Sequence, residues 1–126
     1  MAGERVLVVE DNEKNMRLFR DILQATGYTP LEASSGAQAL ALAAETSPAL
    51  VLMDIQLPDI DGLEALRRLR KTERTAQTPV VALTAQAMQG DRERFLAAGF
   101  DDYLSKPVDV AELVATVRRY CERGDE

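Results

Sequence analysis

Three short, uninterrupted apolar runs constrain the fold of this chain more than any other feature. They occupy residues 6–9, 49–53 and 80–83, and each is bounded by a charged residue, a polar residue or proline. Runs this short cannot span a membrane, but they fit strands that are covered on both faces. Such strands occur in parallel sheets with helices packed against both sides.

Helical patterns separate these runs, because apolar residues there recur at intervals of three and four. Two weaker strand patterns, at residues 28–33 and 103–105, complete the series. The helical segments are about 14–26, 35–46, the stretch after Gly62, about 88–98, and 110–121. The order βαβαβαβαβα predicts an α/β fold with a parallel sheet between two helical layers.

Capping patterns mark several helix ends. Ser35 followed by Gln38 is a capping-box pattern, and Asp109 can cap the last helix. Gly27 and Gly99 stand where helices should stop. The last helix is expected to bury one stripe of residues: Val110, Leu113, Val114, Val117, Tyr120 and Cys121.

Composition excludes several classes of function. The 126 residues include no histidine, so a Ser/His/Asp triad, a His-ligated zinc site and a phosphohistidine carrier are impossible within the chain. Cys121 is the only cysteine, which rules out an internal disulfide and suits a reducing compartment. The net charge of -6 disfavours nucleic acid and anionic membranes as partners. We therefore expect a cytoplasmic protein with no nucleic-acid partner and no membrane insertion.

One local basic group is the exception to this acidic balance. Arg67, Arg68, Arg70 and Lys71 are close together in the helix that follows Gly62. A group of this kind is more often a solvated helix face than a binding patch. We therefore predict that all four side chains face solvent.

Charged and polar residues gather at the predicted strand ends. Glu10 and Asp11 follow the first strand, Asp54 ends the third, Thr84 ends the fourth, and Lys106 follows the fifth. Ligands of open parallel sheets bind at this carboxyl edge, so the five side chains should meet in one cleft. Each residue alone has an ordinary structural explanation, such as helix capping or solvation. Their joint placement favours a functional site.

Three converging carboxylates predict a cation. Two such charges about 5 Å apart repel by about 3 kcal/mol at an effective dielectric of about 20. An all-oxygen site without histidine favours Mg²⁺ over zinc, and Mg²⁺ commonly binds phosphate oxygens as well. Lys106 and Thr84 could contact a phosphoryl group in transfer, which leaves Asp54 as the natural nucleophile.

At these residues the chain closely resembles the receiver domain of two-component response regulators, the CheY-like family. The resemblance rests on VLVVEDN at 6–12, LVLMDIQLPDIDG at 50–62, PVVALTA at 79–85 and YLSKP at 103–107. It implies a flavodoxin-like, doubly wound sheet of five strands in the order 2-1-3-4-5 with five helices. It also implies one receiver domain over residues 1–126, with a core at about 5–122 and no output domain.

The resemblance assigns a role to each matching residue. Asp54 is similar to the phosphoacceptor, and Glu10, Asp11, Asp54 and the Gln56 carbonyl to the Mg²⁺ ligands. Glu10 departs from the commonest family pattern, which has aspartate there. Lys106, ahead of a cis bond to Pro107, resembles the lysine that contacts the phosphoryl group. The pair of switch residues corresponds to Thr84 and Tyr103.

The implied function is signalling rather than enzymatic turnover. A histidine kinase or phosphotransfer protein would donate the phosphoryl group, and a downstream protein would bind the face formed by the fourth helix, fifth strand and fifth helix. Within the family, the segments 10–23, 53–67 and 84–107 resemble a single-domain regulator of bacterial cell division.

Three alternatives remain open. The chain could be a receiver domain from a hybrid histidine kinase. It could also be a Mg²⁺-dependent phosphatase with Asp54 as nucleophile, although those enzymes usually need a second acid where Gln56 stands. A flavodoxin-like binding module is the third, but no phosphate-cradling glycine loop follows the first strand.

Overall fold

The computed structural model describes residues 3–85 and 91–122. Five strands form one parallel sheet in the order β2-β1-β3-β4-β5, as the resemblance implied. The strands are β1 (Arg5–Val9), β2 (Thr29–Ala33), β3 (Leu50–Asp54), β4 (Val80–Thr84) and β5 (Asp102–Ser105). The three apolar runs are therefore β1, β3 and β4, the central strands.

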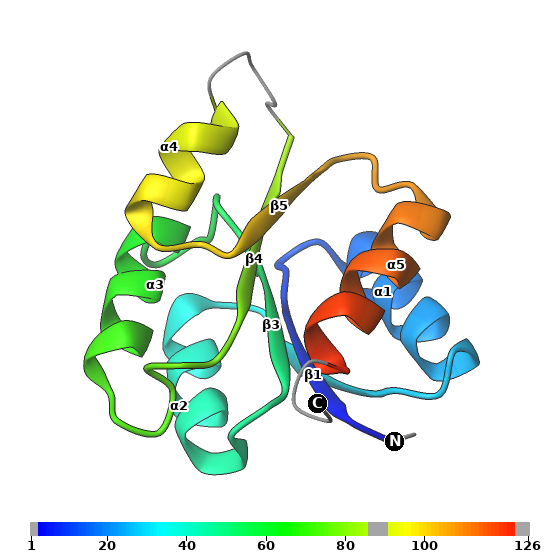
Figure 1. Ribbon diagram of the computed structural model, residues 1–126, viewed down its shortest axis with the longest axis horizontal. Coiled ribbons are helices and arrows are strands. Elements are labelled where there is room, and N and C mark those ends of the chain that lie inside the picture. Colours follow the sequence, from blue (N-terminus) through cyan, green and yellow to red (C-terminus); the bar gives the residue numbers. More distant parts are fainter. Residues whose placement is uncertain (1–2, 86–90, 123–126) are drawn as a thin grey trace.

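Helices cover both faces of this sheet (Figure 1). Helices α1 and α5 lie against one face, and α2, α3 and α4 lie against the other. Their bounds are α1 (Glu13–Ala25), α2 (Gly36–Thr46), α3 (Gly62–Lys71), α4 (Asp91–Ala98) and α5 (Val110–Cys121). The predicted start of α4 near residue 88 falls outside the described residues.

The central strands alternate between two cores. Val6 and Val8 pack with Phe19 of α1 and Val117 of α5, whereas the intervening Leu7 belongs to the core under α2, α3 and α4. Side chains of a strand point alternately to opposite faces, so a strand buried on both sides must be apolar at every position. This requirement explains why these strands appear in the sequence as continuous apolar runs.

Most helix ends follow the predicted chemistry. Gly27 and Gly99 have φ values of 94° and 115°, the left-handed region that favours glycine. Asp109 caps α5 by accepting a hydrogen bond from the Ala111 N–H at 2.9 Å. The capping box of α2 is only half formed, because the Gln38 side chain accepts from the Ser34 N–H and not from that of Ser35.

Two predictions about exposure were wrong. Val110 is 51% exposed, and Thr116 is buried in the stripe instead. A residue in the first turn is flanked by its helix on one side only, so less of its surface is covered. Arg70 is not a solvated residue, since it donates to the carbonyls of Thr78 and Gly99 and to the Asp101 carboxylate.

The other members of the basic group agree with the prediction. Arg67 and Arg68 are exposed and pair with Glu64 one turn away, and Lys71 is exposed. Arg70 differs because its long side chain reaches the loop that joins α3 to β4 and the end of α4. Among the described residues, no helix is long and apolar enough to cross a membrane.

Cys121 is a core residue, as the apolar stripe predicted. It is 6% exposed, and burial is the main cause that raises the pKa of its thiol to about 12. An ordinary thiol has a pKa of 9.0, so the unfolded chain ionises first as the pH rises. Stability that depends on the protonated thiol is therefore complete below pH 9 and is lost toward pH 12.

We expect Cys121 to be nearly unreactive toward a disulfide reagent such as DTNB in the native protein at pH 8. A pKa three units higher lowers the thiolate fraction about a thousandfold. The labelling rate, followed by absorbance, should rise to that of an ordinary thiol when guanidinium unfolds the chain. Fast labelling of the native protein would contradict the buried placement.

Candidate functional site

The carboxyl ends of the strands meet at one edge of the sheet, and this edge holds a cavity of about 510 Å³. Its lining includes the side chains that sequence analysis placed at the strand ends: Glu10, Asp11, Asp54, Thr84 and Lys106. Parallel strands bring their carboxyl ends to the same edge, which explains why residues 96 positions apart become neighbours. The structure thus brings all five together.

The two remaining candidates occupy different places. Gln56 also lines the cavity, directly beyond β3. Tyr103 does not contribute to the described lining; it packs against Phe95 of α4, with ring centroids 5.9 Å apart. Phe95 itself lines the cavity, so Tyr103 lies one side chain behind it.

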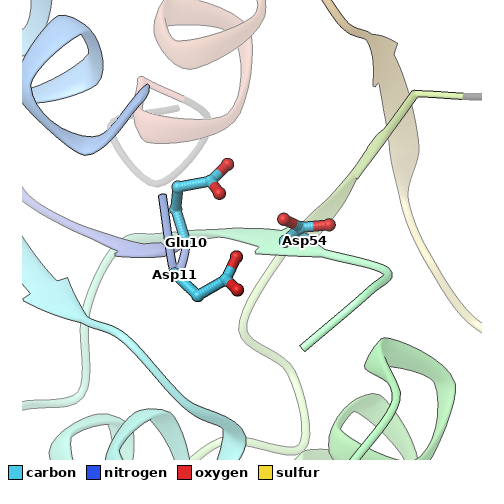
Figure 2. A group of neighbouring side chains, drawn as sticks. All are labelled: Glu10, Asp11 and Asp54. Atoms are coloured by element: carbon cyan, nitrogen blue, oxygen red, sulfur yellow. The ribbon is translucent and has the colours of Figure 1, made fainter. Parts of the chain in front are cut away.

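Three carboxylates form the centre of the site. Figure 2 shows Glu10, Asp11 and Asp54 directed toward a common space, and one oxygen of each lies within 4.8 Å of the others. Glu10 is 2% exposed and Asp54 is 5% exposed, whereas Asp11 faces solvent. This arrangement concentrates negative charge where water can compensate for only part of it.

Lys106 partly neutralises this charge. Its Nζ lies 2.7 Å from Glu10 Oε1 and 2.8 Å from Asp54 Oδ2, so one ammonium bridges two buried carboxylates. The backbone positions the other oxygens: the Gln56 N–H donates to Asp54 Oδ1 at 2.9 Å, and the Asn12 N–H to Glu10 Oε2 at 3.1 Å. Both carboxylates are therefore fixed in orientation. The Lys106–Pro107 peptide bond is cis, as the resemblance implied.

The pKa values of Glu10 and Lys106 are both raised. Burial raises the pKa of Glu10, and the hydrogen bond from Lys106 offsets only part of that shift. Burial acts to lower the pKa of Lys106, but its hydrogen bonds to Asp54 and Glu10 outweigh it and raise that pKa. Lys106 consequently remains a cation at neutral pH.

The donor set suits a hard divalent cation. Glu10, Asp11 and Asp54 supply only oxygen ligands, and the cavity has room for water. Mg²⁺ prefers such ligands and keeps several waters, whereas zinc prefers sulfur and nitrogen. The side chains present therefore fit Mg²⁺.

Sequence reasoning did not identify Arg94, which also lines the cavity from α4. Its guanidinium lies 5.1 Å from the centroid of the Phe95 ring, a cation–π contact. Arg94 lies in the middle of a helix and matches no motif, so local sequence gave no signal. Only the packing of α4 beside β5 brings it to the site.

Comparison with known proteins agrees with this geometry. The family model of the response regulator receiver domain matches residues 6–118. The chain therefore belongs to the response regulator receiver domain family. Among curated relatives, it is similar to the polar-differentiation response regulator DivK of Brucella ovis, at 48% identity over 115 residues that cover 91% of this chain and 94% of the relative.

Solved structures of receiver domains are similar over nearly the whole chain. The receiver domain of the sensor histidine kinase PA1611 from Pseudomonas aeruginosa is 41% identical with a TM-score of 0.87, covering 95% of this chain and 98% of that one. That structure holds a magnesium ion in its active-site cleft. The receiver domain of the Francisella response regulator 1452 is 30% identical with a TM-score of 0.90, covering 97% and 99%.

We expect Asp54→Asn to raise the thermal unfolding midpoint of the metal-free protein. Asp54 attracts Lys106 at 2.8 Å, but two other carboxylates with oxygens within 4.8 Å repel it. At an effective dielectric of about 20, the attraction is about 6 kcal/mol, and the two repulsions, at separations no longer than 4.8 Å, total at least about 7 kcal/mol. Solvent weakens the repulsion from exposed Asp11, but asparagine also removes the cost of burying a charge.

Scanning calorimetry in the presence of a chelator measures this effect. Glu73→Gln is the matched control, because it removes one negative charge from an exposed position outside the cluster. The control should leave the midpoint close to that of the wild type. A lower midpoint for Asp54→Asn would show that the pair with Lys106 outweighs the repulsion.

Proposed function

We propose that the chain receives a phosphoryl group on Asp54 from a phosphohistidine donor, either a histidine kinase or a phosphotransfer protein. The observation that carries this proposal is the placement of Asp54: its carboxylate is buried at the end of β3, oriented by an N–H and an ammonium, and open to the cavity. Membership of the receiver family supports the same role.

The transfer needs little more than positioning. A carboxylate oxygen of Asp54 forms a bond to phosphorus, while the P–N bond breaks and the imidazole leaves with its electron pair. The attacking carboxylate carries no proton to remove, so no general base is required. Lys106 supplies positive charge to the phosphoryl oxygens, and Thr84, which lines the same cavity, offers a hydroxyl.

Mg²⁺ is the proposed cofactor. Glu10, Asp11 and Asp54 would hold it. The backbone carbonyl of Gln56, a residue that lines the same cavity, would be a further ligand. When bound, it neutralises negative charge on the transferring phosphoryl group. The magnesium ion in the cleft of the PA1611 receiver domain supports this assignment.

Signalling would depend on Thr84 and Tyr103. Thr84 faces the acceptor site, and Tyr103 packs behind Phe95 next to α4. A movement of Thr84 toward a phosphoryl group would change the space available to Tyr103. Phosphorylation would then shift the population of conformations on the face formed by α4, β5 and α5, where a downstream protein binds.

The proposed cellular role is that of a cytoplasmic single-domain regulator in cell-cycle control, without enzymatic turnover of substrates. The support is the match to DivK over 94% of that relative's length. A second candidate is a receiver domain that relays phosphate within a hybrid kinase. The similarity to the receiver domain of the sensor kinase PA1611 favours this candidate.

Intact mass spectrometry tests the central step. Incubation with Mg²⁺ and acetyl phosphate should add one alkali-labile phosphoryl group to the wild type and none to Asp54→Asn. Catalytic release of phosphate without an adduct would favour the phosphatase alternative. An adduct on Asp54→Asn would show that another residue is the acceptor.

We expect Lys106→Ala to slow phosphorylation about 100- to 1,000-fold while Mg²⁺ binding persists. Lys106 is the cation next to Asp54, and removal of one preorganised charge typically costs this factor. Removing it leaves all three carboxylates in place for the metal. Adduct formation and calorimetric Mg²⁺ titration measure the two effects, with the exposed Lys71→Ala as control. Loss of Mg²⁺ binding in Lys106→Ala would contradict this division of roles.

A further inference from the structure

The segment between β3 and α3, residues 55–61, is fixed to a distant helix by Asp59. One carboxylate oxygen of Asp59 accepts from the Gly36 N–H at 2.8 Å, and the other accepts from the Ala37 N–H at 2.9 Å. These are the first two N–H groups of α2, 23 and 22 residues away in the chain. The N–H groups at a helix start lack partners within the helix, so a carboxylate there is favourable.

The neighbouring residue adds a steric contact. A side chain at Gly36 would overlap Ile60 Cγ1 and would lie 2.8 Å from Ile60 Cδ1. Ile60 is partly buried against the core on this side of the sheet. The start of α2 and the segment 55–61 are therefore in close contact as well as hydrogen bonded, with the glycine providing the space.

The same segment orients Asp54. Its second residue, Gln56, donates its N–H to Asp54 Oδ1 at 2.9 Å. The ends of the segment are also fixed, because the Ile55 N–H bonds to the Leu83 carbonyl and the Asp61 side chain caps α3. In the middle of the segment, Leu57 and Ile60 pack against the core and Asp59 supplies the hydrogen bonds to α2. Residues 55–58 line the cavity.

We propose that Asp59 is a positioning residue for phosphoryl transfer: by holding segment 55–61 on α2, it keeps the Gln56 N–H on Asp54. The proposal rests on the function proposed for Asp54. The two hydrogen bonds from α2 also lower the pKa of Asp59, so its carboxylate is ionised at neutral pH. The contact consequently persists throughout the range in which the protein would work.

Ser35 provides a matched control. It caps the same helix by accepting from the Gln38 N–H at 3.2 Å, and it makes no described hydrogen bond to segment 55–61. Ser35→Ala therefore weakens the start of α2 without releasing the segment. Asp59→Ala removes two bonds from the same helix start and releases the segment.

The test measures two quantities on folded protein: the rate of Asp54 phosphorylation by acetyl phosphate at saturating Mg²⁺, and amide hydrogen exchange of Gln56. Asp59→Ala should slow phosphorylation on the order of tenfold and accelerate Gln56 exchange relative to the central strands. Ser35→Ala should match the wild type in both. Wild-type behaviour of Asp59→Ala, or equal losses in Ser35→Ala, would overturn the proposal.

Two further variants keep the test decisive. If Asp59→Ala does not fold, Asp59→Asn retains one acceptor oxygen and should show a smaller loss in the same direction. Gly36→Ala places a methyl group against Ile60 and 3.3 Å from Asp59 Oδ1, so it crowds the same contact without replacing Asp59 and should reproduce the phenotype. If wild-type protein forms no adduct, the function proposed for Asp54 fails, whereas Gln56 exchange still shows whether Asp59 holds the segment.

Discussion

The bridge from Lys106 to Glu10 and Asp54 is the interaction on which the site depends. Two carboxylates at 2% and 5% exposure lie side by side, and burying such charges is costly without a nearby cation. Lys106 supplies that cation from the loop after β5, and a divalent ion would supply more. Three carboxylates face one ammonium, so the site keeps an excess of negative charge. A bound metal ion would reduce that excess.

The sheet makes this concentration of charge possible. Its three central strands are buried on both faces, and their apolar side chains form two separate cores. Because the strands are parallel, their carboxyl ends all open at one edge. The polar residues can therefore gather there without disturbing either core. The strands supply the buried apolar contacts of the two cores, and the polar residues of the cavity end or follow these strands.

The segment after β3, residues 55–61, connects the polar residues of the site to the helices that cover the sheet. Asp54 ends the strand, and the Gln56 N–H orients the Asp54 carboxylate. Asp59 accepts from the first two N–H groups of α2, and Asp61 accepts from the Glu64 N–H in the first turn of α3. The seven residues 55–61 thereby link the Asp54 carboxylate to α2 and α3. The Asp54 carboxylate and the start of α2 are therefore both hydrogen bonded to the same short piece of chain.

The sequence by itself determined the element types, their order and the chemistry available. Apolar periodicity shows where each strand ends and which of its side chains are buried. Residue types limit which ligands the residues after a strand can bind. The five site residues at the strand ends were therefore predictable. The strand order was reached only by resemblance, because pairing between strands far apart in the chain leaves no local pattern. The tertiary structure alone decided the exposure of Val110, the contacts of Arg70, the arrival of Arg94 at the cavity and the capping of α2 by Asp59. Each of these features depends on which distant segment packs against the residue, and local periodicity does not contain that information.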